Sequence, residues 1–276
     1  MPELPEVETT RAGIEPWVVG QQITGFSVRN ANLRWPVELP SELTGATIAA
    51  AGRRGKYILL TTEPGTLLIH LGMSGSLRVL SSDTPPLKHD HVDLHLASGQ
   101  CLRLNDPRRF GSVLFQAGDD PLLHPLLAHL GVEPLGNEFH GAYLFDRARR
   151  RKGAVKNFIM DSSVVVGVGN IYAAEALFAA GIRPATAAGR IPAHRYDRLA
   201  REIVAVLSRS VREGGTTLRD FVGSDGQPGY FKQRLFVYGR QGQPCRQCST
   251  TLKHQVIGQR SSVYCPKCQT SQNFAR

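Results

Sequence analysis

The sequence predicts a mixed helix-and-sheet protein of the α+β class, in which three kinds of segment follow one another along 276 residues. Short apolar or alternating runs between about residues 20 and 116 are separated by Gly, Pro, Asn and Asp, which indicates strands of a β-sandwich or a barrel. Helical spacing dominates after about residue 120. Four of the five cysteines lie in the last 32 residues, which predicts a small metal-bound tail.

A short helix is expected over the first sixteen residues. Leu4, Val7 and Ile14 fall near one face, and Pro5 suits a first turn because it lacks an amide hydrogen. We expect Pro16 to end this helix. The strand candidates that follow it are short, and they lie at 23–28, 57–60, 66–71, 77–80, 92–96, 102–104 and 113–115.

Helices are expected in the second half of the chain, where Gly181 and Gly214 are placed as C-terminal stops. The stretches with helical spacing are 121–130, 141–160, 170–180 and 192–213. Short strands around the cysteines follow from about residue 236. We therefore expect a β-rich domain over residues 1–120, a helical domain over 121–235 and a metal-bound finger over 236–276.

The net charge of +10 is unevenly distributed. Residues 1–135 carry 11 Lys and Arg against 14 Asp and Glu, whereas residues 136–276 carry 22 against 9. A basic C-terminal half suggests a surface that docks a polyanion, the alternative being a generically basic surface. No run approaches the ~18 uninterrupted apolar residues of a membrane helix, and the acidic N-terminus is unlike a signal peptide. We expect a cytoplasmic protein.

The strongest generic motif is a double pair of cysteines, Cys245-x-x-Cys248 and Cys265-x-x-Cys268, with sixteen residues between the pairs. Two such turns supply four thiolates for a tetrahedral zinc site, and no position remains for a water ligand. We therefore expect one structural zinc ion whose binding is coupled to folding of the tail. A redox pair is the alternative interpretation. Cys101, alone in an apolar strand, is expected to serve packing.

A glycine-rich turn, Gly167-Val168-Gly169-Asn170, leads into a predicted helix. It could open a dinucleotide-binding unit, but the third glycine is missing and a helix is expected before the turn. The other interpretation is a helical hairpin that presents backbone amides to a DNA phosphate. The basic run 149–152 and Lys156 could contact the same backbone, or could be a solvated charged face.

Alternating polar side chains at 89, 91, 93 and 95 share one face of a predicted strand. His-x-His spacing can bind a metal, whereas the polar face of a half-buried strand and a DNA-contacting face are the other two interpretations.

Taken together, these residues resemble one family closely, the formamidopyrimidine-DNA glycosylases. The matching motifs span nearly the whole chain in the family's order, and the cysteine tail completes them. They are MPELPEVET at 1–9, RRGKY at 53–57, IHLGMSGSLR at 69–78, KHDHVDL at 88–94, DPRRFG at 106–111, VVGVGNIYAAEALFAAGI at 165–182 and SDGQPGYF at 224–231.

The resemblance implies an N-terminal helix with a β-sandwich, a helix–two-turn–helix DNA-binding domain and a single four-cysteine zinc finger. It also implies release of oxidised purines, 8-oxoguanine and formamidopyrimidines, from duplex DNA, followed by strand cleavage through β,δ-elimination. The residues alone predict DNA binding and zinc but not this substrate. We expect no organic cofactor, and a monomer that associates with the nucleoid through DNA.

The resemblance assigns the nucleophile to Pro2, whose amine is exposed once Met1 is removed. An α-amine has a pKa of roughly 8 against ~10.4 for lysine, which leaves ~100-fold more free base at neutral pH. A secondary amine also forms an iminium that acidifies the C2′ proton of deoxyribose. From the residues alone, a proline that merely starts a helix explains the position equally well.

Three further catalytic roles follow from the resemblance. Glu3 is similar to the general acid, which requires partial burial if it is to hold a proton. Lys56 matches the lysine that touches the damaged base and the phosphate and is assigned to β-elimination. Arg260 matches the arginine assigned to δ-elimination, and because a guanidinium is a poor proton donor, we expect it mainly to clamp phosphate.

The remaining contacts implied by the resemblance concern the flipped-out nucleotide and the backbone. Phe110 is the expected wedge, Arg108 faces the orphaned cytosine, and Met73 completes the trio that fills the void. Met73 and Phe110 could otherwise be core residues. Residues 216–230 resemble the loop that closes over the flipped base. The expected phosphate contacts are His89, Arg151, Lys156 and Asn170, with position 151 ambiguous within the basic run.

Two rival functions remain at this point. The sister family, endonuclease VIII, uses the same proline chemistry on oxidised pyrimidines, but Leu4 and the void-filling trio favour the purine enzyme. A non-catalytic zinc-finger protein would not be expected to retain Pro2, Glu3 and Lys56 together.

Overall fold

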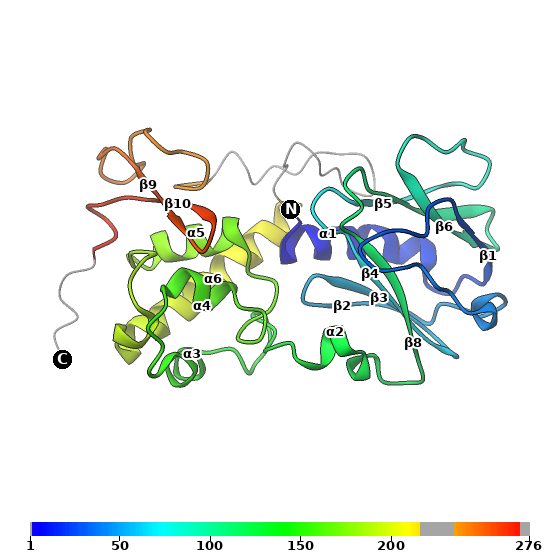
Figure 1. Ribbon diagram of the computed structural model, residues 1–276, viewed down its shortest axis with the longest axis horizontal. Helices are drawn as coiled ribbons and strands as arrows, with labels where there is room; N and C mark the ends of the chain where they lie inside the picture. The colour runs from blue at the N-terminus through cyan, green and yellow to red at the C-terminus, as the bar shows by residue number, and fades with distance from the viewer. Residues whose placement is uncertain (1, 216–234, 271–276) are drawn as a thin grey trace. The chain divides into compact units, whose positions relative to one another are not determined.

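The computed structural model describes residues 2–215 and 235–270. Two compact units are present: Met1–His129 with Glu213–Lys232, here called unit 1, and Leu130–Arg212 with Gln233–Arg276, here called unit 2. Figure 1 shows the elements of each unit. The predicted lesion-capping segment, 216–230, lies outside the described residues. In the described part of the chain, no helix is both long and apolar enough to cross a membrane.

Unit 1 begins with helix α1, Leu4–Val18, which buries Leu4, Val7 and Ile14 as predicted. The prediction that Pro16 ends the helix is wrong, since α1 continues for two residues beyond it. Proline removes only its own amide donor, and the backbone N–H of Val19 still donates to the Glu15 carbonyl at 3.1 Å. A proline in the last turn therefore does not stop this helix.

Two four-stranded antiparallel sheets follow α1, and two separate sheets identify a sandwich instead of a barrel. One has the order β1-β6-β7-β5 and the other the order β2-β3-β4-β8. The strands are β1 Ile23–Val28, β2 Ala50–Arg54, β3 Tyr57–Thr62, β4 Gly65–His70, β5 Ser76–Ser81, β6 Asp90–Leu96, β7 Gln100–Asn105 and β8 Ser112–Ala117.

A single apolar cluster fills the sandwich and includes side chains from α1, both sheets and the short 3-10 helix η1, Ser41–Leu43. Ile14, Ile58, Leu60, Leu67 and Leu104 are each 1% exposed or less. Cys101 is also buried, as expected for a packing role. Strand β2 escaped the prediction because its sequence, AAGRR, neither alternates nor forms an apolar run.

The alternating polar residues on β6 do not form a metal site. Asp93 is fully buried and is bonded to both Arg29 and Arg103. Although burial opposes it, these two guanidinium groups hold the pKa of Asp93 below its usual value. His95 bonds the Ser27 hydroxyl at 2.8 Å, and His89 lies before the strand. This face is therefore a satisfied structural network.

The predicted helical stretch 121–130 contains only the short helices η2, Pro121–Leu123, and α2, Pro125–Ala128, both in unit 1. In unit 2, the stretch 141–160 divides into α3, Gly141–Ala148, and α4, Val155–Met160. Arg150 between them has a left-handed φ of 63°, which interrupts a continuous helix.

Helices α5, Asn170–Ala179, and α6, Ala193–Arg212, follow the prediction closely, with the 3-10 helix η3, Ala188–Arg190, between them. Gly181 and Gly214 have φ values of 68° and 74°, as expected for residues that stop helices.

The cysteine tail packs on α5 within unit 2 and contains a hairpin of β9, Lys253–Ile257, and β10, Arg260–Tyr264. Ala174 and Phe178 of α5 share one buried cluster with Val237, Leu252, Val263 and two of the cysteines. The Glu175 carboxylate accepts the backbone N–H groups of Phe236, Val237 and Tyr238 at 2.8–2.9 Å. The tail is thus joined to the helix that follows the glycine turn.

Candidate catalytic and DNA-binding site

The start of α1 positions the first two candidate catalytic residues. Pro2 is buried and Glu3, the N-cap of the helix, is 2% exposed. Glu3 and Glu6 form a capping box, in which the Glu3 backbone N–H donates to the Glu6 carboxylate at 2.8 Å. The burial that a general acid requires is therefore present at Glu3, and its backbone is fixed by the helix.

Lys56 occupies the tight turn between β2 and β3. Arg54 pairs with Tyr57, which leaves Gly55 and Lys56 as a two-residue hairpin turn, and Gly55 has the positive φ of 57° that such turns require. Arg53 binds the Gly55 carbonyl at 2.9 Å and the Glu8 carboxylate of α1 at 2.9 Å. One guanidinium thus connects the lysine's turn with the helix that begins just after Pro2 and Glu3.

His70 lies beside the turn of Lys56, and the sequence reasoning did not single it out. It pairs with Tyr57, next to Lys56, and the two rings lie 4.8 Å apart. Burial, together with the positive charges of Lys56 and Arg34, lowers the pKa of His70 to about 4. Its Nδ1 accepts the Gly72 N–H at 2.9 Å, so the neutral ring carries its proton on Nε2. The IHLG motif contained this residue but gave no spacing signal for it.

The expected void-filling trio lies on two loops of unit 1. Met73 follows β4 and is 37% exposed, while Phe110 precedes β8 and is 41% exposed. Both are therefore loop residues, and the core alternative is excluded. Arg108 lies in the Phe110 loop, with its guanidinium carbon 5.1 Å from the centre of the phenyl ring. An exposed aromatic ring beside a cation is a suitable surface for unstacked bases.

His89 stands at the entrance to β6 with a left-handed φ of 74°. Its ring is half-buried and its carbonyl accepts the Asp106 N–H at 3.0 Å. His89 therefore belongs to the same loop cluster as Arg108, and its phosphate contact stays a prediction.

The glycine turn precedes α5 without a strand before it, so a dinucleotide-binding unit is excluded. Gly167 has a φ of 80° and Gly169 is the N-cap, which places Asn170 as the first helical residue. The Asn170 Oδ1 atom is buried and accepts no hydrogen bond from the described residues. Helix N-termini favour anions through their free amides and dipole, which suits a phosphate contact.

Lys156 of α4 has a different environment from the one expected of a phosphate contact. Its side chain is fully buried, and its Nζ donates to the Ser261 carbonyl at 2.8 Å and the Ser262 hydroxyl at 2.6 Å. In the described structure, Lys156 therefore holds β10 against α4, and its phosphate contact stays a prediction. Charge and spacing alone could not indicate that this side chain would point inward.

Arg260 opens β10 immediately after the β9–β10 turn and is exposed. A Cβ added at Gly258 of this turn would lie 2.6 Å from the Asn157 amide, so α4 supports the turn as well as the strand. Arg151 is exposed and lies 3.5 Å from the Asp161 carboxylate. An ion pair at this distance on the surface stabilises little and leaves the guanidinium accessible to phosphate.

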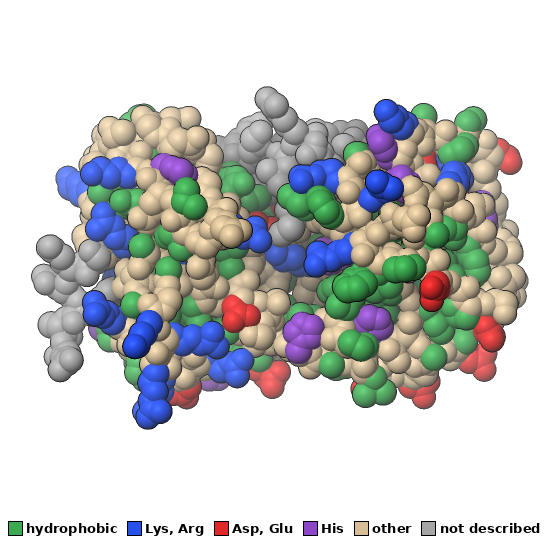
Figure 2. Space-filling model, viewed as in Figure 1, with side chains coloured by type: hydrophobic (Ala, Val, Ile, Leu, Met, Phe, Trp, Pro, Cys, Tyr) green, Lys and Arg blue, Asp and Glu red, His purple; other side chains and the backbone are tan. Residues whose placement is uncertain are grey.

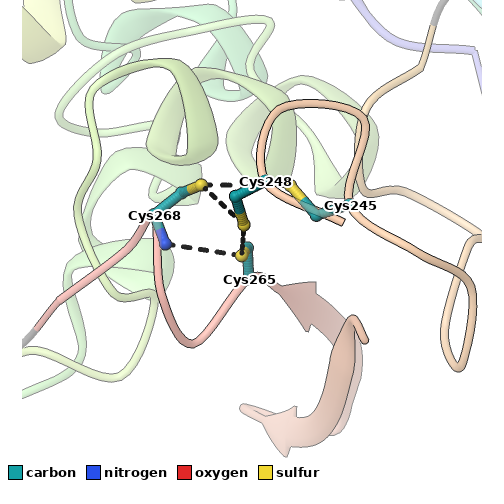
Figure 3. Close-up of side chains that lie close together, drawn as sticks. All are labelled: Cys245, Cys248, Cys265 and Cys268. Carbon is teal, nitrogen blue, oxygen red and sulfur yellow. Dashed lines mark hydrogen bonds between the residues drawn. The ribbon is translucent and has the colours of Figure 1, made fainter. Parts of the chain in front are cut away.

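The cysteines form the only such cluster of metal-ligand side chains among the described residues. The Sγ atoms of Cys245, Cys248, Cys265 and Cys268 all lie within 4.8 Å of one another and converge on one point in Figure 3. The separations include 3.9 Å for Cys245 and Cys268 and 3.5 Å for Cys248 and Cys265. A tetrahedral zinc with bonds of ~2.3 Å requires sulfurs about 3.8 Å apart. The four thiolates fit one structural zinc ion.

Lysine and arginine side chains are distributed over the visible face of unit 2, with several over α3, as Figure 2 shows. This agrees with the excess of basic residues in the second half of the sequence. Such a surface attracts nucleic-acid phosphates through long-range electrostatics.

Comparison with known proteins gives three domain matches. Residues 1–113 match the N-terminal domain of formamidopyrimidine-DNA glycosylase, and residues 130–222 match its H2TH domain. Residues 242–270 match the zinc finger found in FPG and IleRS. Fold and site thus define a DNA glycosylase with a zinc finger. More specifically, the chain belongs to the formamidopyrimidine-DNA glycosylase family.

Its relatives cover almost the whole length. The formamidopyrimidine-DNA glycosylase of Magnetococcus marinus is 59% identical and is aligned over 98% of this chain and 99% of its own. Among solved structures, MutM (Fpg) of Thermus thermophilus is 36% identical with a TM-score of 0.88, over 97% of this chain and 98% of its own. A Lactococcus lactis Fpg variant in complex with Fapy-dG-containing DNA is 31% identical with a TM-score of 0.91, over 98% and 100%.

Proposed function

We propose that this protein is a base-excision repair enzyme that removes oxidised purines from duplex DNA and then cleaves the strand at the abasic site. The observation that carries the proposal is the family's domain set with Pro2 and Glu3 at a buried helix start. The related Lactococcus lactis protein was solved with Fapy-dG DNA and with abasic-site DNA, and a MutM protein with carbocyclic 8-oxo-G DNA.

The proposed reaction begins with the Pro2 amine. Attack on the deoxyribose C1′ breaks the bond to the damaged base, which leaves with the electron pair, and joins the Pro2 nitrogen to the sugar. After this nitrogen loses its proton, Glu3 protonates the ring oxygen O4′, and opening of the sugar ring leaves an iminium between Pro2 and C1′. Loss of the C2′ proton then breaks the bond to the 3′ phosphate, a β-elimination assigned to Lys56. The second elimination releases the 5′ phosphate while Arg260 holds it.

The remaining site residues bind and deform the duplex. Phe110 and Met73 replace the extruded nucleotide in the stack, and Arg108 donates to the O2 and N3 atoms of the orphaned cytosine. His89, Asn170, Arg151 and Lys156 contact phosphates. Lys156 supports the hairpin of Arg260 from within the protein.

Excision of oxidised pyrimidines is the second candidate function, because it uses the same amine chemistry. Borohydride reduction separates the two: a duplex with 8-oxoguanine opposite cytosine should give far more trapped enzyme–DNA adduct than one with an oxidised pyrimidine. The reverse preference would replace the proposal with the pyrimidine activity.

The proposal extends to domain limits, location and assembly. We infer catalytic, helical and finger domains over residues 1–120, 121–235 and 236–276, with the capping loop in the second. A monomer in the cytoplasm, bound to the nucleoid through DNA, suits an enzyme whose substrate is chromosomal DNA.

Binding to DNA should depend strongly on salt, because the contacts are directed mostly to phosphates. The slope of log K against log salt is expected to be about −0.9 for each phosphate that the protein neutralises. Fluorescence anisotropy with an undamaged duplex over a roughly fourfold range of salt, about 50 to 200 mM, measures this slope. A slope near zero would show that the basic half is not the docking surface.

Arg108→Ala should flatten the preference for lesions paired with cytosine over those paired with adenine. Loss of its two donors should cost on the order of 1–3 kcal/mol, roughly ten- to a hundredfold in excision rate. Cleavage of a preformed abasic site should change less, since no base needs to be extruded. Single-turnover rates on the two pairs give the ratio.

The neighbouring Arg109 provides the matched control for this prediction. Arg109 has a left-handed φ of 56° and Arg108 does not, so the two neighbouring residues differ in backbone conformation. If Arg109→Ala loses the discrimination and Arg108→Ala keeps it, the reader of the orphaned base is Arg109.

A further inference from the structure

Asp106 is the first residue of the loop that carries Arg108 and Phe110, and its side chain is fully buried. Its Oδ1 accepts the Ser74 hydroxyl at 2.9 Å, from the loop of Met73. Its Oδ2 accepts the Gly111 N–H at 2.7 Å, directly after Phe110. One buried carboxyl group therefore connects both loops.

The backbone of Asp106 extends the same connection to the strand that follows His89. Its N–H donates to the His89 carbonyl at 3.0 Å, and its own carbonyl accepts the His91 Nε2–H at 2.9 Å. The Arg109 N–H donates to that carbonyl at 3.2 Å and closes the turn on which Arg108 stands. Asp106 thus fixes three segments through both its side chain and its backbone.

The two loops approach each other too closely to slide independently. A Cβ added at Gly72 would lie 2.4 Å from both the Gly111 nitrogen and the Phe110 carbonyl carbon. The two backbones are therefore packed too closely to admit even a methyl group, and the Asp106 carboxylate is hydrogen-bonded to both loops at this joint. The guanidinium of Arg108 then stacks on Phe110 outside this buried joint.

We propose that Asp106 is a positioning residue for lesion recognition, which holds the Met73 loop and the Arg108–Phe110 loop as one rigid wedge. It acts through these side chains without touching DNA. The inference rests on the proposed function and adds a residue that determines opposite-base specificity. Removing one of the two accepting oxygens should loosen the wedge and the alignment of Arg108, while the chemistry at Pro2 stays intact.

The test is Asp106→Asn, which keeps the shape but cannot accept from both Ser74 and Gly111 as a carboxylate does. We expect the ratio of excision opposite cytosine to excision opposite adenine to fall about tenfold or more, within the range for lost base contacts. Cleavage of a preformed abasic site should change little. A parallel fall of both activities would reduce Asp106 to a general structural role and overturn the proposal, as would an unchanged ratio.

A double variant gives the sharper measurement. If Asp106 acts through Arg108, combining Asp106→Asn with Arg108→Ala should reduce the ratio no further than Arg108→Ala alone. Fully additive losses would contradict the mechanism. Ser74→Ala, which removes one partner and keeps the carboxylate, should show the same pattern with a smaller loss, and it serves if Asp106→Asn does not fold.

The matched control is Asp120→Asn. Asp120 also accepts a backbone N–H, that of Leu122 at 2.8 Å, but on an exposed surface of the same unit. The ratio of excision opposite cytosine to excision opposite adenine should be the same in Asp120→Asn as in the unaltered chain. If the unaltered chain forms no borohydride-trapped adduct with the 8-oxoguanine duplex, the proposed function itself fails, an outcome distinct from an unchanged ratio in an active Asp106→Asn enzyme.

Discussion

A chain that retains Met1 should form no covalent adduct with DNA, because the Pro2 nitrogen is then an amide without a free electron pair. The processed chain should be trapped by borohydride on its first residue. The loss is expected to be complete for the covalent step, since a neutral amide cannot form an iminium. Mass spectrometry of the digested adduct identifies the modified residue.

Two variants test whether the Pro2 amine or a neighbouring side chain is the nucleophile. Pro2→Gly keeps an α-amine and should retain weak activity, provided that Met1 is removed. Lys56→Ala keeps Pro2 and should still form the adduct, with slower elimination. An adduct that maps to Lys56 in the unaltered protein would overturn the assignment of the nucleophile.

Replacement of Cys265 by serine should release the zinc and abolish tight DNA binding. Cys265 is fully buried in the cluster that includes Phe178 and Val263, so the thiolate contributes to packing as well as to the metal. Structural zinc sites of this kind contribute ~10–16 kcal/mol to folding of small fingers, which the tail cannot replace from its own core. Elemental analysis and anisotropy measure the two effects.

Cys101→Ala is the control, because Cys101 is buried in β7 and far in sequence from the finger. It should keep one zinc per chain. Active protein without zinc, or a Cys265→Ser protein with unchanged metal content and affinity, would show that the cluster has another role.

Much of the fold could be predicted from local patterns in the sequence. Short apolar or alternating runs indicated most of the strands, and Gly181 and Gly214 marked helix ends that the structure confirms. The failures have local causes as well. Pro16 removes one donor without ending α1, and β2 owes its strand conformation to pairing with β3. Tertiary pairing of this kind leaves no trace in a five-residue window.

The candidate site likewise contains residues that the sequence alone could indicate and residues that it could not. The zinc ligands follow from spacing, because two Cys-x-x-Cys turns need no distant information to be recognised. The inward direction of Lys156 depends on β10, more than one hundred residues away, as its bonds to Ser261 and Ser262 show. The hydrogen bonds of Asp106 to two loops could not be predicted either, because these loops meet only in the folded chain. Burial and long-range partners are properties of the folded chain.

The most direct test of the function is to identify the base that the enzyme releases. Duplexes that contain 8-oxoguanine opposite cytosine, or an oxidised pyrimidine opposite its normal partner, are incubated with processed enzyme. Released bases and strand ends are then measured by mass spectrometry. We predict free 8-oxoguanine together with a one-nucleotide gap that carries phosphate at both ends. Release of the oxidised pyrimidine in preference, or an intact strand after base release, would contradict the account.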